Sequence, residues 1–450
     1  MLAARHIVSR GATSCVRAWV RAPRAATTSL LLTAPHVQRR EVTTSERSGG
    51  KAAQGTVHYQ AASVTVASTV PLTATAMMQV CWEGGGTDVY PYVWLRDNCQ
   101  CSICFHPVSK MRKLLVEDLQ LGVSPSDIQV VDSGRVIEVL WSDGHLATYP
   151  ATWLHQRAFN THKRDLRNNT VRSKPTLWGK ELLENLPRAS FPELLQDDSA
   201  LLQFLQQLES HGLVVVSDTP TKLGQLHRLS DRVAYLSRSH YGETFIVESK
   251  NDPINLAYTA AKLEMHSDIP SRKYKPCIQM LHCIRQFHGE GGDNQLTDGF
   301  QVSHNFRTLH PDKFHILATT PVDFIDIGVE DGRDFFLVNH DPMIRLDING
   351  QIQSVNFNQF SRDSYFRVPV EEVAGWYDAM KTFRDMVNDN QYCIEYKMKD
   401  GDILVFDNFR LLHGRKAYTI EGERVLEGGY WEWDDVLSRR RVLQAKLSNE

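Results

Sequence analysis

Three residues of this 450-residue chain have the types and spacing of an iron-binding set: His266, Asp268 and His413. Residues two apart in a strand point to the same face, so His266 and Asp268 can present an imidazole and a carboxylate to one metal. His413 lies in residues 403–415, which read as a buried strand and the turn after it. Two histidines and one carboxylate on one face leave other coordination positions open, as in the facial triad of non-haem Fe(II) oxygenases. The alternative is a chance His-x-Asp in a chain with 18 histidines.

Arg424 lies in residues 424–430, which we expect to form the strand after the one that carries His413. Its guanidinium is a planar fork that matches a carboxylate. Placed beside the metal, Arg424 would hold the distal carboxylate of a chelating oxo-acid. The alternative for Arg424 alone is a solvated surface charge, which is the usual environment of arginine.

Three cysteines within six residues, Cys99, Cys101 and Cys104, predict a second metal site. Thiolates at this spacing can reach one Zn(II), which takes four ligands in a tetrahedron. We favour His145 as the fourth ligand over His106, which would strain a chain already wrapped around the metal. With all four ligands from protein, this zinc would be structural. The alternatives are three unligated core cysteines or a redox-active thiol pair.

The first fifty residues have the composition of a mitochondrial presequence. They hold eight arginines, two acids (Glu41 and Glu46) and many Ser, Thr and Ala residues. The alternative is a basic disordered tail. Residues 29–32 are far too few to span a membrane, and no later segment approaches the required length.

The rest of the chain is acidic, since residues 1–50 contribute about +6 to a total net charge of −3. Nucleic acid is therefore not an expected partner. Eight cysteines without a secretory signal fit neither a disulfide scaffold nor a secreted protein, so we expect a reducing compartment.

Periodicity predicts a mainly β chain with flanking helices. Strands are expected at 135–141 and 145–149 around the turn 142–144, helices from Asp198 to Gly212 and over 370–387, and a buried strand at 213–216. The middle of the chain fits a closed or sandwiched β-structure flanked by helices. The expected parts are a presequence or disordered segment (1–50), a zinc-binding N-terminal domain (75–165), a linker (166–190) and a catalytic domain (191–445).

Residues 94–99 with the cysteine cluster, the His266/Asp268 pair, and residues 322–329 and 407–415 resemble the gamma-butyrobetaine and trimethyllysine hydroxylase family of Fe(II)- and 2-oxoglutarate-dependent oxygenases. The resemblance runs from about residue 80 to 445. It implies a double-stranded β-helix (jelly-roll) catalytic domain, a small zinc-binding N-terminal β domain and a homodimer. It assigns iron to His266, Asp268 and His413, 2-oxoglutarate to Arg424, and zinc to Cys99, Cys101, Cys104 and His145, with ascorbate as a further cofactor.

The same resemblance implies an aromatic cage for a trimethylammonium group, which cannot donate hydrogen bonds and is held against ring faces. The matching cage positions are Tyr241, Phe245, Tyr258 and Tyr430, with Phe245 where the family has a tryptophan. Asn255 and Asn358 match the amides that bind the substrate carboxylate. Ile269 replaces a tyrosine of the best-known member, which removes one polar contact. The alternative is that these aromatic residues are ordinary core residues.

The resemblance thus implies hydroxylation of gamma-butyrobetaine to L-carnitine by O2 and 2-oxoglutarate. The alternatives are trimethyllysine hydroxylation, or a paralogue that acts on another trimethylammonium acid. Asn255, which is neutral, and the complete cysteine cluster favour gamma-butyrobetaine, whereas the presequence fits a mitochondrial trimethyllysine enzyme. We expect a mitochondrial matrix protein, with the cytoplasm as the alternative. A candidate of another class is a non-enzymatic zinc module, which metal analysis would distinguish.

Overall fold

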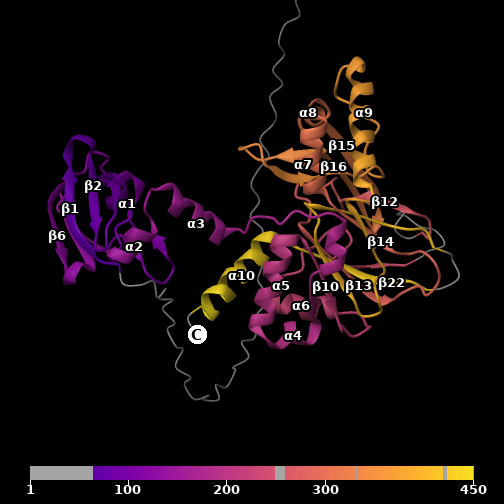
Figure 1. Ribbon diagram of the computed structural model, residues 1–450, viewed down its shortest axis with the longest axis horizontal. Helices are drawn as coiled ribbons and strands as arrows, with labels where there is room; N and C mark the ends of the chain where they lie inside the picture. Colours follow the sequence, from indigo (N-terminus) through magenta and orange to yellow (C-terminus); the bar gives the residue numbers. More distant parts are fainter. Residues whose placement is uncertain (1–63, 249–258, 331, 419–422, 449–450) are drawn as a thin grey trace, which may run out of the picture. The chain divides into compact units, whose positions relative to one another are not determined.

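The computed structural model describes residues 64–248, 259–330, 332–418 and 423–448 (Figure 1). The predicted presequence and the two predicted site residues Asn255 and Tyr258 lie outside these ranges. In the part of the chain that is described, no helix combines the length and the apolar character needed to cross a membrane.

Residues 64–160 contain two three-stranded antiparallel sheets around one core. The first has the order β1 (Val66–Leu72), β2 (Met77–Trp82), β3 (Thr87–Pro91), and the second has the order β6 (Pro125–Val131), β7 (Val136–Trp141), β8 (Leu146–Pro150). The other elements include α1 (Tyr92–Asp97), the short pair β4 (Phe105–His106) and β5 (Met111–Arg112), and α2 (Ala151–Gln156). Buried residues alternate along β2 and β7, as expected for strands with one core face. The predicted hairpin at 135–149 is confirmed by β7 and β8.

Residues 188–448 are built around a six-stranded sheet with the order β11-β22-β13-β20-β10-β9. Its strands are β9 (Arg188–Ser190), β10 (Leu213–Ser217), β11 (Thr244–Val247), β13 (Ile278–Arg285), β20 (Ile403–Asp407) and β22 (Val425–Trp431). Only the edge pair β9/β10 is parallel. Every residue of β20 is buried, which agrees with its central position between β13 and β10.

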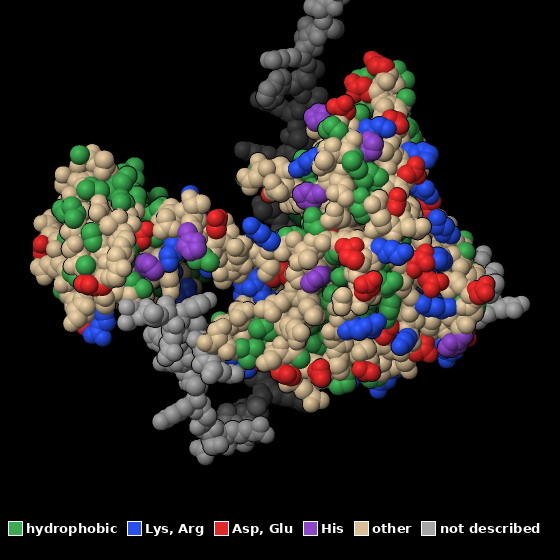
Figure 2. Space-filling model, in the orientation of Figure 1, with side chains coloured by type: hydrophobic (Ala, Val, Ile, Leu, Met, Phe, Trp, Pro, Cys, Tyr) green, Lys and Arg blue, Asp and Glu red, His purple; other side chains and the backbone are tan. Residues whose placement is uncertain are grey.

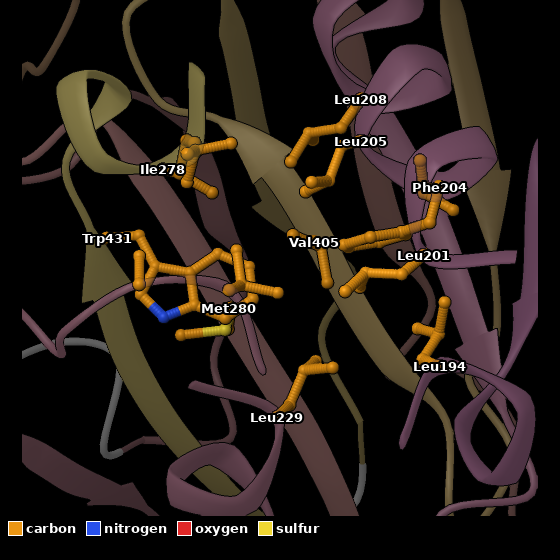
Figure 3. Close-up of a cluster of buried hydrophobic side chains, with 14 of the residues drawn as sticks. Leu194, Leu201, Phe204, Leu205, Leu208, Leu229, Ile278, Met280, Val405 and Trp431 are labelled. Carbon is orange, nitrogen blue, oxygen red and sulfur yellow. The ribbon is translucent and has the colours of Figure 1, made fainter. Parts of the chain in front are cut away.

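Four helices cover one face of this sheet: α4 (Phe191–Gln196), α5 (Asp198–His211), α6 (Gln225–Val233) and α10 (Trp433–Leu447). Figure 3 shows Leu201, Leu205 and Leu208 of α5 directed at Val405 of β20, with Trp431 of β22 in the same cluster. Each fully buried side chain of this kind contributes roughly 1.5–3 kcal/mol. The spacing of the leucines thus fixes which face of α5 meets the sheet.

The second sheet has four antiparallel strands in the order β12-β21-β14-β19. They are β12 (Leu263–His266), β14 (Asn294–Asp298), β19 (Cys393–Tyr396) and β21 (Leu411–Arg415). Leu281 and Leu404 of the first sheet share a buried cluster with Leu296 and Ile394 of the second. The two sheets therefore enclose a common core, and the expectation of β-structure flanked by helices is confirmed.

The chain passes from the first sheet to the second at a corner held by Arg410. This buried guanidinium donates to both carboxylate oxygens of Asp298, at 3.0 and 2.8 Å, and to the carbonyl oxygens of Ser210 and Thr176. A bidentate pair of this kind fixes orientation as well as distance. The corner sets the path of β21, which carries His413.

A separate group of helices and hairpins packs beside the second sheet. It comprises α7 (Gly299–Leu309), α8 (Pro311–Thr319), β15 (Pro321–Glu330), β16 (Arg333–Pro342), β17 (Ile344–Leu346), β18 (Ile352–Val355) and α9 (Val370–Val387). In the face drawn in Figure 2, lysines and arginines are interspersed with acids over this region. Lys313 and Asp378 pair at 2.8 Å between α8 and α9. Exposed pairs of this kind contribute at most about 1 kcal/mol.

Residues 166–190, predicted as a linker, contain more structure than that prediction implies. They include most of α3 (Thr161–Val171), the 3-10 helix η4 (Lys180–Asn185) and the edge strand β9. Trp178 and Leu182 are buried in the core between the sheets. The carbonyl of Pro187 accepts a hydrogen bond from Val215, 2.9 Å away. Proline has no backbone N–H to donate. It is compatible with an edge strand because one side of such a strand has no partner strand and needs no donor.

Candidate metal centre and cofactor pocket

His266, Asp268 and His413 come together because β12 and β21 are antiparallel neighbours. His266 and His413 are direct partners in the register, and their ring centroids are 4.2 Å apart. Asp268 follows β12, and its Oδ1 lies 3.2 Å from Nε2 of His266 and 3.7 Å from Nε2 of His413. The predicted juxtaposition of these three residues is what the structure shows.

This donor set fits a six-coordinate divalent ion. Bonds of roughly 2.1 Å at right angles would place neighbouring ligand atoms about 3 Å apart, which is close to the observed separations. The Nδ1 atom of His266 lies 2.8 Å from the carbonyl oxygen of Glu264, so a proton on Nδ1 leaves Nε2 as the metal-binding nitrogen. One carboxylate and two imidazoles leave positions open for further ligands.

The ionisation of His413 and Asp268 also suits a metal. Burial, together with the neighbouring His266, lowers the pKa of His413 to about 3, so its imidazole is neutral at physiological pH. Burial alone would raise the pKa of Asp268, but the hydrogen bond with His266 and the nearby imidazole of His413 hold that pKa well below its usual range. Metal ligation requires a neutral imidazole and an ionised carboxylate, which are the forms that His413 and Asp268 take here.

Three further side chains orient Asp268: Gln279 and Asn408, which were not predicted as site residues, and Tyr430, which was predicted only for the aromatic cage. Gln279 of β13 donates to Oδ2 of Asp268 at 2.7 Å, and the Tyr430 hydroxyl donates to the same oxygen at 2.8 Å. Asn408 bonds the backbone N–H of Asp268 through Oδ1 at 2.7 Å and the backbone carbonyl of Asp268 through Nδ2 at 3.0 Å. With Oδ2 and the backbone held, Oδ1 is directed at the histidines.

Ile269, the next residue, is in the left-handed region with φ 51°. A β-branched residue is a marked outlier there. Ile269 is buried and lines the cavity next to the metal-binding set. The bonds of Asn408 to Asp268 impose this turn, so backbone strain lies directly beside the site.

The cavity next to the three residues has a volume of ≈ 280 Å³ and contains Arg424. Arg424 is 5% exposed, and among the described residues no carboxylate lies within ion-pair distance of it. Its Nη2 donates to Asn294 at 3.4 Å, while its Nε has no hydrogen-bond partner among the described residues. Burial and then the nearby Arg415 lower the pKa of Arg424 to about 10. A buried cation with free donors in a cavity is suited to an anionic ligand.

The predicted cage residues within the described ranges form a row of rings along this cavity. The centroids of Tyr241 and Phe245 are 5.7 Å apart, and those of Phe245 and Tyr430 are 5.4 Å apart. Phe245 lies opposite Gly428 in the register, and a Cβ on Gly428 would meet the Phe245 ring at 2.2 Å. The absence of a side chain at Gly428 is therefore what lets the Phe245 ring lie across β22.

Asn358 also lines the cavity, and most of its polar groups are engaged. Its amide donates to the carbonyl of Ser267 at 3.0 Å, and its Oδ1 accepts from the backbone N–H groups of Phe360 and Ser361 at 3.0 Å each. One N–H of the amide remains for a ligand.

The second predicted metal set also comes together. The Nε2 of His145 lies 3.3 Å from the sulfur of Cys99, and 3.5 Å from the sulfurs of Cys101 and Cys104. Bonds of about 2.3 Å to sulfur and 2.0 Å to nitrogen in a tetrahedron would separate these atoms by roughly 3.5 Å. His106, the rejected alternative, instead pairs with Ser109 at 2.8 Å. The donor set and spacing thus fit Zn(II).

Arg96 and Asp143 support this set from outside. Arg96 donates to the sulfur of Cys104 at 3.4 Å and to Asp143 at 2.8 Å, while Asp143 accepts from the backbone N–H of His145 at 3.0 Å. Burial raises the pKa of Cys99 to about 12, so metal binding there would displace a proton. The guanidinium offsets part of the negative charge that three thiolates would carry.

The chain was compared with known proteins. It matches the Taurine catabolism dioxygenase TauD, TfdA family over residues 169–430 and the Gamma-butyrobetaine hydroxylase-like N-terminal family over residues 72–155. It is 38% identical to human gamma-butyrobetaine dioxygenase over 388 residues, which are 86% of this chain and 99% of that protein. A Pseudomonas gamma-butyrobetaine dioxygenase is 31% identical, over 82% of this chain and 94% of that protein. The mitochondrial trimethyllysine dioxygenase of rat is 28% identical, over 79% of this chain and 82% of that protein. The chain therefore belongs to the TauD, TfdA family of dioxygenases and is a 2-oxoglutarate-dependent dioxygenase, related most strongly among these three to the gamma-butyrobetaine enzymes.

Proposed function

We propose that this chain hydroxylates gamma-butyrobetaine to L-carnitine with Fe(II), O2 and 2-oxoglutarate. The observation that carries the proposal is the single cavity that joins the His266/Asp268/His413 set, the guanidinium of Arg424, which has no carboxylate partner among the described residues, and a row of three rings. The identity to human gamma-butyrobetaine dioxygenase, 38% against 28% for the rat trimethyllysine enzyme, favours this substrate.

His266, Asp268 and His413 would hold the iron, which when bound with 2-oxoglutarate supplies the oxidant for a C–H bond. The residues of the chain determine position. Gln279 and Tyr430 keep Oδ2 of Asp268 occupied, so only Oδ1 is offered to the metal. The cavity would then hold the substrate beside the metal.

Arg424 would pair with the distal carboxylate of 2-oxoglutarate. The guanidinium can form a bidentate contact with a carboxylate, and the ligand would neutralise a charge that is buried without a carboxylate partner among the described residues. Asn294 orients the guanidinium from the neighbouring sheet.

Tyr241, Phe245 and Tyr430 would hold the trimethylammonium group against their ring faces. The remaining N–H of Asn358 would bind the substrate carboxylate. Asn255 and Tyr258, outside the described residues, are proposed for the same two roles on the strength of the family resemblance. Phe245 and Ile269 replace more polar residues of the family and would set the tolerance for other trimethylammonium acids.

Several finer assignments belong to the same proposal. The two facing sheets would be a double-stranded β-helix, the Cys99/Cys101/Cys104/His145 set would bind structural zinc, and the enzyme would be a homodimer that uses ascorbate to keep its iron reduced. The arginine-rich residues 1–50 support a mitochondrial matrix location. Metal analysis, solution mass and organelle fractionation test these assignments separately.

The test of the reaction offers gamma-butyrobetaine and trimethyllysine in parallel to the chain with Fe(II), ascorbate, O2 and 2-oxoglutarate. The expected product is carnitine, detected by mass, with one succinate formed for each carnitine. Hydroxytrimethyllysine as the main product would assign the enzyme to the alternative substrate. Succinate with neither product would contradict the substrate assignment but not the iron chemistry.

A further inference from the structure

Asp326 lines the same cavity as the three rings, and its carboxylate takes no part in the functions assigned so far. Asp326 lies on β15 and is a lining residue together with Tyr241, Phe245 and Tyr430. Among the described residues that line the cavity, the other carboxylate is Asp268, whose two oxygens face the histidines and the Gln279 and Tyr430 donors. The charge of Asp326 is therefore the one available to a ligand.

The neighbours of Asp326 leave its negative charge without a lysine or arginine partner among the described residues. Among the described residues its neighbour within ion-pair distance is the imidazole of His240, whose Nε2 lies 3.3 Å from Oδ2 of Asp326 without the alignment of a hydrogen bond. The His240 ring is buried between two aromatic rings, with centroids 3.9 Å from Tyr241 and 4.5 Å from Phe335. No lysine or arginine of the described residues forms an ion pair with Asp326.

His240 also connects Asp326 to the proposed cage. It is the chain neighbour of Tyr241 and packs against its ring at an interplanar angle of 41°, so the carboxylate and the first cage ring both contact one imidazole. Phe335 lies opposite Gly328 across the β15/β16 hairpin, which brings the hairpin against His240. The hairpin thus places the carboxylate of Asp326 near the aromatic residues of the cavity, while Arg424 provides positive charge elsewhere in the same cavity.

We propose that Asp326 is a specificity-determining residue that attracts the permanent positive charge of the substrate, with His240 as its positioning residue. The proposal rests on the proposed function, because it concerns the cation held by the same rings. A quaternary ammonium cannot donate hydrogen bonds, so rings and fixed charge are what can recognise it. Phe245 gives a weaker π face than the tryptophan of the family. A carboxylate must therefore supply a larger share of the attraction for the trimethylammonium group.

The test compares two carboxylates of the same shape, one with a cationic head group and one with a neutral head group. The ligands are gamma-butyrobetaine and 5,5-dimethylhexanoate, in which carbon replaces the ammonium nitrogen. Their dissociation constants are measured by calorimetry on the full chain with Mn(II) and 2-oxoglutarate, for the unsubstituted protein, Asp326→Asn and Asp334→Asn. Asp334 is an exposed acid on the same hairpin, so Asp334→Asn removes an equal charge away from the cavity.

Asp326→Asn should raise the dissociation constant of gamma-butyrobetaine about ten-fold, a value reduced for the partial exposure of the carboxylate. The dissociation constant of 5,5-dimethylhexanoate should change by less than about two-fold. Asp334→Asn should change neither. Equal weakening of both ligands would assign Asp326 a structural role, and no weakening of either would remove it from recognition; each result overturns the proposal. Failure of the unsubstituted chain to make carnitine contradicts the proposed function instead, and the ratio of the two binding constants still tests Asp326.

Discussion

Replacement of Arg424 by methionine should affect the ligand-free and the ligand-bound protein in opposite directions. Lowering the pKa of a buried guanidinium from 12.5 to about 10 costs the folded state roughly 3 kcal/mol. Because the pKa is lower in the folded than in the unfolded chain, this cost is fully present below pH 10 and fades as the pH rises from 10 toward 12.5. Arg424→Met removes the cost at neutral pH, so the ligand-free variant should be as stable as the unsubstituted protein or more stable.

The ligand-bound protein should respond the other way. Two charge-assisted hydrogen bonds to the distal carboxylate of 2-oxoglutarate would contribute roughly 1.5–3 kcal/mol each to binding. Arg424→Met should therefore raise the dissociation constant of 2-oxoglutarate by about 100-fold or more. At a concentration one hundred times the dissociation constant, 2-oxoglutarate stabilises the unsubstituted protein by about 2.7 kcal/mol. At the same concentration the variant should gain less than about 0.5 kcal/mol.

The assay is thermal unfolding with Mn(II), with and without 2-oxoglutarate. Arg285→Met is the matched control, because Arg285 is an exposed arginine of the same sheet that pairs with Glu423. The control should keep the full stabilisation by 2-oxoglutarate. A variant at Arg424 that still gains about 2.7 kcal/mol would refute the carboxylate assignment, and a ligand-free variant less stable by 3 kcal/mol or more would refute the argument from burial.

Three further changes test other parts of the site. His266→Ala should abolish both succinate and hydroxylated product, measured by mass, and persistent turnover would remove this residue from the iron set. Cys104→Ser should lower zinc, measured by elemental analysis, from about one per chain to well below that, since a structural zinc site draws its binding energy from all four ligands; unchanged zinc would place the metal elsewhere. Gly428→Ala should destabilise the protein by about 1–3 kcal/mol and raise the KM for gamma-butyrobetaine, because the new methyl group overlaps the Phe245 ring. Adding Phe245→Ala to Gly428→Ala should restore part of the stability but not the KM, and additive losses would contradict the overlap.

Local signals explain the elements that could be predicted from the sequence. The Asp197 side chain caps the first turn of α5, and Gly212 ends this helix with φ 73°, so both ends are encoded within a few residues. The helix α9 has its predicted bounds of Val370–Val387. His266 and Asp268 could be paired from their spacing alone, because the period of a strand decides which face they share.

Contacts made across the sheets could not be predicted in this way. Gln279 and Asn408 reach Asp268 only because β13, β20 and β22 pair in one register, and no spacing rule connects these residues. Asp326 likewise joins the cavity through the β15/β16 hairpin rather than through a motif of its own. The strand β9 escaped prediction because three residues at a sheet edge carry little periodic signal.

The pairing of β12 with β21 and of β10 with β20 has a consequence for how the enzyme is made. In both pairs the partner strands come from distant parts of the chain. Pairing them closes a long loop, and the chain loses this conformational entropy before the contacts between the strands can form, which slows folding. During synthesis His266 emerges from the ribosome long before β21, the strand that carries His413. The hairpins of residues 64–160, in contrast, can form from neighbouring segments. An unfinished chain therefore cannot bring His266, Asp268 and His413 together, so the iron chemistry proposed for this set would be withheld until the strand that carries His413 has left the ribosome.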